Sequence, residues 1–202
     1  MKNKFGVDIA LNVVIIVLEI IACIIFMESV GSIDLTYYTI DSNLFLLISC
    51  ILYLAFRKNT PRIVQLFKYS STLSVLITFL VVIFVLMPMY DFNYHFLLLD
   101  GPAIYVHVLC PILACISFIL FERNDLENTF KNNLRAIYFT IAYGIILIIL
   151  NVEKIVVGPY PFLKVYEQSF LMSLFWVILI MGVAFILARL LLMIKDLDRI
   201  LN

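Results

Sequence analysis

Charged residues are scarce in this sequence, and the shortage excludes two broad classes of protein. Only 14% of the 202 residues are charged, whereas 64% are hydrophobic. A water-soluble domain of this size cannot bury so much apolar surface, so much of it must face lipid. The 14 basic and 14 acidic residues give a formal net charge of zero, so the chain offers no basic face to nucleic acid. We therefore predict an integral membrane protein that binds no nucleic acid.

The sequence also lacks the features that divide a chain into parts or bind a metal. No internal repeat, low-complexity tract or linker interrupts it, which predicts a single membrane domain over residues 1–202. Its four cysteines fall within apolar stretches, and their spacing fits neither a zinc site nor an extracellular disulfide framework. They are Cys23, Cys50, Cys110 and Cys115. We predict that they are small packing residues and that the protein uses no metal and no cofactor.

Long apolar runs are what the sequence has in abundance. Six of them are long enough to cross a bilayer as helices, which takes about 20 residues. The predicted spans are 8–29, 38–56, 69–88, 102–121, 134–151 and 170–194. The first run is too long for the apolar part of a signal peptide and contains Asn12 and Glu19, so we expect it to be retained. The predicted fold class is an all-α integral membrane protein with six transmembrane helices.

The distribution of Lys and Arg between alternate connections predicts the orientation of the six spans. Twelve basic residues fall on the side of the two termini and of the second and fourth connections. They are Lys2, Lys4, Arg57, Lys58, Arg62, Lys68, Arg123, Lys131, Arg135, Arg189, Lys195 and Arg199. Only Lys154 and Lys164 fall on the other side. Because basic residues are retained in the cytoplasm, we predict a protein of the cell membrane with both termini cytoplasmic.

One short segment concentrates polar side chains at the start of the second predicted span. Residues 37–43 are Tyr-Tyr-Thr-Ile-Asp-Ser-Asn. Polar groups are costly in hydrocarbon, so such a cluster predicts a functional site. Thr39, Ser42 and Asn43 stand at i, i+3 and i+4 and share one helical face. Asp41 lies roughly 200° from Thr39 on a regular helix, so we expect it to be an accessory group.

A histidine lies at the same predicted depth of the membrane. His107 is five residues into the fourth span, which enters from the same side as Thr39. Pro111 has no N–H to donate to the His107 carbonyl, so a kink or widened turn is expected there. A neutral His beside a Thr hydroxyl can act as the base that activates it, with Ser42 and Asn43 orienting the pair. The alternative is that these groups are hydrogen-bonding contacts between helices.

Two further features belong to the predicted pocket. Glu19 lies in the middle of the first span, where a charge is costly, so we expect it to be protonated or hydrogen-bonded to another helix. A proton-relay or transport role is the alternative for this residue. The connection before the last span carries four residues suited to a lid over the site, a lipid entrance or a plain interfacial connector. These are Pro159, Tyr160, Pro161 and Phe162.

Three segments together resemble a known family. They are Tyr-Thr-Ile-Asp-Ser-Asn at 38–43, His-Val-Leu-Cys-Pro at 107–111 and Gly-Pro-Tyr-Pro-Phe-Leu at 158–163. In this order they are similar to motifs of the FAR-17a and androgen-induced-protein family, which includes the androgen-dependent TFPI-regulating protein and related bacterial multispan proteins. The resemblance implies a membrane-embedded threonine hydrolase, since characterised animal members cleave fatty acid esters of hydroxy fatty acids with a Thr nucleophile and a His. Carried over, these roles fall on Thr39 and His107.

The leading prediction is therefore hydrolysis of a lipid ester by Thr39 and His107, with Glu19 and the polar residues around Thr39 orienting them. The alternative is a non-catalytic lipid- or ion-binding protein, or a small transporter, that uses the intramembrane Glu, Asp and Asn side chains. Membrane lipids are the predicted partners, and a lipid ester is the predicted substrate. The oligomeric state is left open.

Overall fold

Helices make up all the regular structure of residues 4–201, the part of the chain that the computed structural model describes. The main helices are α1 (Lys4–Val30), α2 (Tyr38–Ala55), α3 (Arg62–Val81), α5 (Cys110–Ile116), α6 (Phe130–Ala136), α7 (Tyr138–Val152) and α8 (Phe170–Leu201). Shorter segments extend or connect them: η1 (Arg57–Asn59), η2 (Val82–Leu86), α4 (Met87–Met89), η3 (His95–Leu99), η4 (Ile104–Leu109), η5 (Ser117–Phe121) and η6 (Pro161–Leu163). Among these described residues, five stretches are long and apolar enough to cross a membrane, and the bent pair α6–α7 makes a sixth if it counts as one span.

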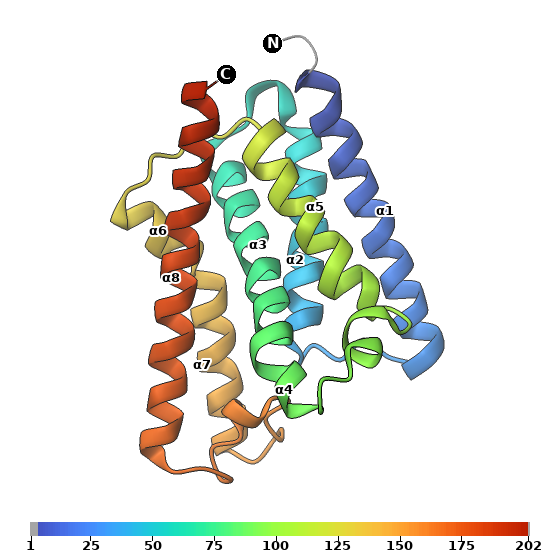
Figure 1. Cartoon of the computed structure of the whole chain (residues 1–202), viewed down its shortest axis with the longest axis vertical. Coiled ribbons are helices and arrows are strands. Elements are labelled where there is room, and N and C mark those ends of the chain that lie inside the picture. The colour runs from blue at the N-terminus through green and yellow to red at the C-terminus, as the bar shows by residue number, and fades with distance from the viewer. Residues whose placement is uncertain (1–3, 202) are drawn as a thin grey trace.

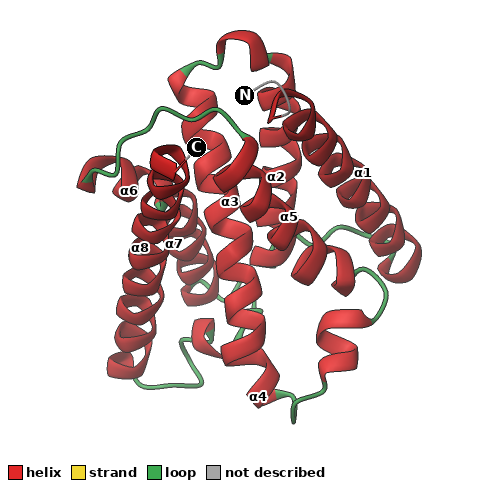
Figure 2. Ribbon diagram, turned by 45° about the horizontal axis from the view of Figure 1, so that its top comes forward, coloured by secondary structure: helices red, strands yellow, loops and turns green. Residues whose placement is uncertain are grey.

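Helix α3 lies at the centre of the bundle (Figure 1 and Figure 2), where it contacts α2, α5, α6, α7 and α8. Its many small hydroxyl residues explain this position, because small side chains let neighbouring helices approach closely. The hydroxyl oxygens of Ser71 and Ser49 lie 2.6 Å apart, and those of Thr78 and Ser42 lie 2.9 Å apart. Helices α2 and α3 are therefore joined by a row of hydroxyl contacts.

Two apolar clusters include residues of this central helix. The outer helices also expose apolar side chains on the surface of the bundle. One cluster joins α1, α2, α3 and α5 around Leu46, and the other joins α3, α7, α8 and the loop before α8 around Leu191. Helices α1 and α8 expose large apolar side chains such as Val17 and Ile178, which are 48% and 64% accessible. Such surfaces are expected where a helix faces hydrocarbon rather than water.

The two ends of the described chain lie at the same end of the bundle. Helix α1 begins and α8 ends there (Figure 1). The start of α2, the end of α7 and the loop before α8 lie at the opposite end. Thr39 therefore lies in the half of the bundle remote from the termini.

Three predicted spans differ from the observed helices. The sixth, predicted to end at residue 194, continues in α8 to Leu201, so Lys195 lies inside the helix and is buried. The third helix begins at Arg62 rather than near residue 69, so Lys68 lies inside α3 and not in the connection before it. The helix continues through this residue because the buried ammonium has a partner, with Nζ 3.4 Å from Glu122 Oε1. The fifth span is bent by 45° between α6 and α7. At this bend the N–H of Ile137 bonds to the carbonyl of Leu134, three residues back, which tightens the turn.

The widened turn expected near His107 is present. The segment η4 (Ile104–Leu109) is a π-helix, in which each bond spans one residue more than in an α-helix. Pro111 follows in the first turn of α5. Because Pro111 donates no N–H, the turn before it relaxes into the wider form. The four cysteines are free thiols, of which Cys50 and Cys110 are fully buried.

Candidate functional site

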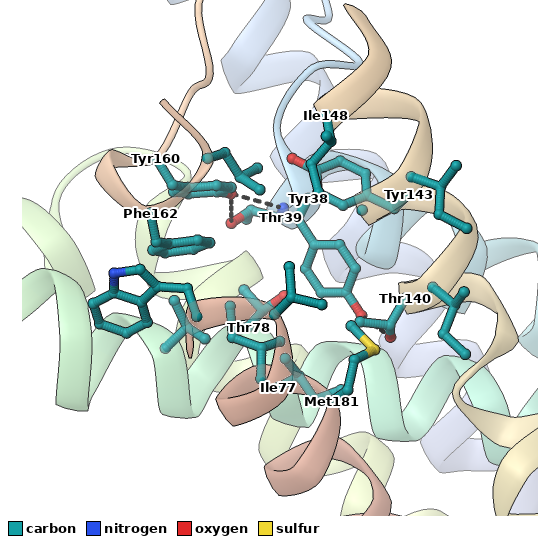
Figure 3. Close-up of a pocket in the computed structure, with 18 of the residues that line it drawn as sticks. Tyr38, Thr39, Ile77, Thr78, Thr140, Tyr143, Ile148, Tyr160, Phe162 and Met181 are labelled. Atoms are coloured by element: carbon teal, nitrogen blue, oxygen red, sulfur yellow. Dashed lines mark hydrogen bonds between the residues drawn. The ribbon is translucent and has the colours of Figure 1, made fainter. Parts of the chain in front are cut away.

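An apolar cavity of about 380 Å³ lies between α2, α3, α7, α8 and the loop before α8 (Figure 3). Its volume falls within the range of small-molecule pockets, ~300–1,000 Å³. Aliphatic side chains form most of the wall, and aromatic rings complete it. The aromatic residues are Tyr38, Tyr143, Tyr160, Phe162 and Trp176. The side-chain polar groups on the wall are hydroxyls and the indole N–H, so the cavity suits a largely apolar ligand.

Thr39 places a hydroxyl group on this wall. It lies in the first turn of α2, where backbone N–H groups have no partner within the helix. The side chain of Tyr37 does not cap them. Instead the Tyr160 hydroxyl accepts a bond from Thr39 N–H at 3.4 Å and lies 3.5 Å from Thr39 Oγ1 (Figure 3). Both distances are long for hydrogen bonds, so the Thr39 side chain is held loosely.

The loop before α8 folds tightly enough to bring Tyr160 to the cavity. A Cβ atom on Gly158 would lie 2.6 Å from the carbonyl carbon of Leu163, so glycine is required at this close approach. The rings of Tyr160 and Phe162 stack with centroids 5.2 Å apart, and Phe162 packs against Trp176 of α8 at 5.6 Å. These ring contacts hold the loop against α8, and the loop thereby forms part of the cavity wall.

The four residues predicted to form a lid divide into two pairs. Tyr160 and Phe162 line the cavity, whereas Pro159 and Pro161 shape the loop without contributing to the wall, and Pro161 begins η6. Burial raises the pKa of Tyr160, although hydrogen bonding from Thr39 opposes the shift. The Tyr160 phenol is therefore neutral near neutral pH and keeps a hydrogen to donate toward the Thr39 hydroxyl.

We expect Tyr160→Phe to loosen the loop from α2 without changing the shape of the cavity. The ring still stacks on Phe162, but Thr39 N–H loses its acceptor, which costs about 1 kcal/mol of unfolding free energy, as for a lost helix cap. Thermal unfolding in detergent measures this loss. Tyr166→Phe is the matched control, because that exposed hydroxyl bonds to the Val152 carbonyl away from the cavity. Equal stability of the two variants would contradict the capping role.

The other polar residues of the cluster tie α2 to its neighbours. Ser42 Oγ donates to the Thr39 carbonyl at 3.1 Å and contacts Thr78 of α3. Asn43 Nδ2 donates to the carbonyls of Thr39 at 2.7 Å and Val106 at 3.3 Å. Asp41 lies on the other face of the helix and is only partly buried. Ser42, Asn43 and Asp41 are not among the residues that line the apolar cavity.

His107 is near this cluster but outside the cavity wall. Its Nδ1 lies 2.6 Å from the Leu97 carbonyl, which can only accept, so Nδ1 carries a proton and Nε2 is free to accept one. Within residues 4–201, no hydrogen bond joins His107 to Thr39. The segments that carry Thr39 and His107 are connected instead by Asn43, which bonds to the carbonyl of Val106, the residue before His107.

A buried polar network in the half of the bundle near the termini was not predicted. Glu122 Oε1 accepts bonds from Ser117 at 2.6 Å and Asn12 at 3.0 Å, and it pairs with Lys68. Lys68 Nζ also lies 2.9 Å from Cys50 Sγ. All of these side chains are almost fully buried. They form a charged layer inside the α1–α2–α3–α5 group.

A second set of polar residues continues the network toward the ends of the chain. Asp8 accepts bonds from Arg57 at 2.8 and 3.0 Å and from Tyr53 at 3.0 Å. The sequence did contain a signal for this stripe. Asp8, Asn12 and Glu19 stand at i, i+4 and i+11 and therefore share one face of the first span.

Apart from Thr39, Tyr160 and Phe162, the residues of the cavity wall form no recognisable pattern in the sequence. These residues, such as Ile77 and Met181, are ordinary apolar positions of four different helical stretches. Comparison of the chain with protein-family models, curated proteins and solved structures finds no match.

Proposed function

We propose that this protein is a cell-membrane hydrolase of lipid esters, with both termini cytoplasmic and the acyl chain bound in the apolar cavity. The observation that carries the proposal is the position of Thr39, whose hydroxyl belongs to the wall of an otherwise largely apolar cavity. An acyl chain moving from the bilayer into this cavity keeps apolar surroundings. The ester group is then the part that the wall hydroxyls recognise.

The proposed reaction follows the chemistry of an activated hydroxyl. Thr39 Oγ1 attacks the ester carbonyl carbon, while its proton passes to His107 Nε2 and then to the departing alkoxide. Water then attacks the acyl carbonyl carbon while His107 takes its proton, and His107 returns this proton to Thr39 Oγ1 as the acyl–Thr39 bond breaks and the fatty acid leaves. The Tyr160 hydroxyl, 3.5 Å from Thr39 Oγ1, is placed to donate to the negatively charged oxygen of the intermediate.

Two features of His107 bear on its role as the base. The bond from Nδ1 to Leu97 selects the tautomer with Nε2 as acceptor. The reaction also requires Nε2 to reach Thr39 Oγ1 directly or through one water, a bond that catalytic groups often form only when substrate is bound. His107→Gln is therefore expected to lower kcat, because glutamine can occupy the site without accepting the proton.

A non-catalytic lipid-binding protein is the second candidate. It is favoured by the partner of His107, which is Leu97 rather than Thr39. An assay of fatty-acid release by the purified protein distinguishes the two functions. Fatty acid esters of hydroxy fatty acids and monoacylglycerols are the substrates to test. Release of fatty acid that depends on Thr39 supports the hydrolase. Saturable lipid binding without release supports the second candidate.

We expect Gly144→Phe to block the cavity without unfolding the protein. Gly144 lines the cavity from α7, and a Cβ atom there meets no heavy atom of another part of the protein within 4 Å. The added side chain begins in open space at the cavity wall, and we expect its ring to enter the cavity and compete with an acyl chain. Affinity for a fluorescent fatty-acid probe should fall at least tenfold, about 1.4 kcal/mol.

Gly182→Phe is the matched control for this substitution. Gly182 lies on α8, is exposed, and has equally open space around its Cβ position, but it does not line the cavity. Probe affinity should be unchanged in this variant, and both variants should keep the wild-type unfolding temperature. Equal probe affinity in the two variants would exclude the cavity as the binding site for the chain.

A further inference from the structure

A second, much smaller cavity lies between α1, α2 and η4, apart from the apolar cavity. Its volume is about 10 Å³, which is close to the room required by one water molecule. Two polar side chains, Glu19 of α1 and Asn43 of α2, reach its wall. The other lining residues are Ala22, Cys23, Phe26, Ile33, Ile40, Leu44 and Val106. Two polar groups therefore meet in a largely apolar setting.

Both polar side chains are buried and present an oxygen without a hydrogen-bond donor. Glu19 is 2% exposed and Asn43 is 3% exposed. Within residues 4–201, neither Glu19 Oε1 nor Asn43 Oδ1 accepts a hydrogen bond. The orientation of the Asn43 amide is fixed, because its nitrogen faces two carbonyl oxygens, those of Thr39 and Val106. The remaining oxygen of Asn43 is therefore an acceptor, as is an ionised Glu19.

The charged neighbours do not neutralise Glu19 by direct contact. Lys68 of α3 bonds to Glu122 and to Cys50 of α2, and it acts on Glu19 only at longer range. The other titratable groups that interact with Glu19 are thiols: Cys110 of α5, which hydrogen-bonds to its carboxyl group, Cys23 of α1 and Cys50 of α2. Among the described residues, no basic side chain forms an ion pair with Glu19. An ionised Glu19 would thus be a buried carboxylate without a direct counter-ion, which is a costly state.

We propose that Glu19 and Asn43 form a proton-binding site, in which the protonated Glu19 carboxyl donates to Asn43 Oδ1 directly or through one water. A single proton removes the charge and gives both oxygens a hydrogen-bond partner. A metal cation fits less well, because hard cations take about six or more oxygen ligands and most of this wall is hydrocarbon. The site does not depend on the proposed hydrolysis.

The proton would also link three helical segments. Asn43 already holds the carbonyls of Thr39 in α2 and of Val106 in η4. A hydrogen bond from Glu19 to the same amide would connect α1 to α2 and η4. Glu19 then acts as a positioning residue for the two segments that carry Thr39 and His107, while remaining outside the apolar cavity.

Infrared difference spectroscopy of the purified protein tests the site without any activity assay. The wild type near neutral pH should show the C=O stretch of a protonated carboxyl, and Glu19→Gln should remove this band. Glutamine keeps an N–H donor for Asn43, so the variant is expected to fold. Asn43→Leu should shift the band by removing its acceptor. Asp41→Asn, which changes a partly buried carboxyl on the other face of α2, should leave it in place.

Three results would overturn the proposal. The first is a band that survives in Glu19→Gln, and the second is the absence of any protonated-carboxyl band in the wild type. The third is loss of the band, with a rise in unfolding temperature, when sodium chloride replaces choline chloride, because it would assign the site to a metal cation. If Glu19→Gln does not fold, wild-type protein with ¹³C-labelled glutamate shows whether a glutamic acid carries the band.

Discussion

Replacing Thr39 by alanine should abolish covalent labelling by a fluorophosphonate probe and reduce ester hydrolysis by a factor on the order of 10³–10⁶, the range for loss of a catalytic nucleophile. The reason is that Thr39 provides the hydroxyl that would form the acyl intermediate at the cavity wall. Labelling is measured by mass spectrometry of the purified protein, and hydrolysis by release of fatty acid.

The controls separate a nucleophile from a structural hydroxyl. Thr39→Ser keeps the oxygen and should retain part of the labelling. Ser42→Ala removes another buried hydroxyl of the same helical face, one that bonds to the Thr39 carbonyl and Thr78 but does not line the cavity. It should lose some stability but keep the labelling. An adduct on a residue other than Thr39 would refute the assigned nucleophile.

The second large effect concerns stability. Replacing Lys68 by methionine should lower the free energy of unfolding by about 3–5 kcal/mol, because it leaves the buried Glu122 carboxylate without its countercharge. Lys68 and Glu122 are each about 1% exposed, with Nζ and Oε1 3.4 Å apart. Unfolding in mixtures of mild and denaturing detergent, followed by circular dichroism, measures the change.

Two comparisons show whether the pair itself is responsible. The double variant Lys68→Met, Glu122→Gln removes both charges and should recover much of the lost stability, since Gln can still bond to Ser117 and Asn12. Lys164→Met breaks the exposed pair with Glu167 and should cost less than about 1 kcal/mol. A double variant no more stable than Lys68→Met would show that the buried charge is not the cause.

The apolar runs predicted the positions of the helical stretches well, because long hydrophobic segments have few alternatives to a membrane helix. The i, i+3, i+4 spacing likewise separated the buried Thr39, Ser42 and Asn43 from the partly buried Asp41. Pro111 also predicted the widened turn before it, because the missing N–H is a property of the residue itself.

Features that depend on contacts between distant segments were not predicted. Lys68 looked like a loop residue because its partner, Glu122, lies 54 positions away in the chain. The cavity and its contact between Thr39 and Tyr160 depend on how α2, α7 and α8 pack, which periodicity within one segment does not specify. The predicted depths of Thr39 and His107 placed both residues in one layer of the membrane. Depth alone does not specify which groups their side chains bond to.

The bond between Thr39 and Tyr160 also constrains how the protein is made. Thr39 is synthesised and inserted early, whereas Tyr160 follows 121 residues later and is fixed by stacking that reaches Trp176 in the last helix. A ribosome-bound chain that extends only through η5 contains α2 but neither the loop nor α8. The cavity wall is therefore completed only after α8 has been made, so the candidate site is absent from biosynthetic intermediates that lack α8.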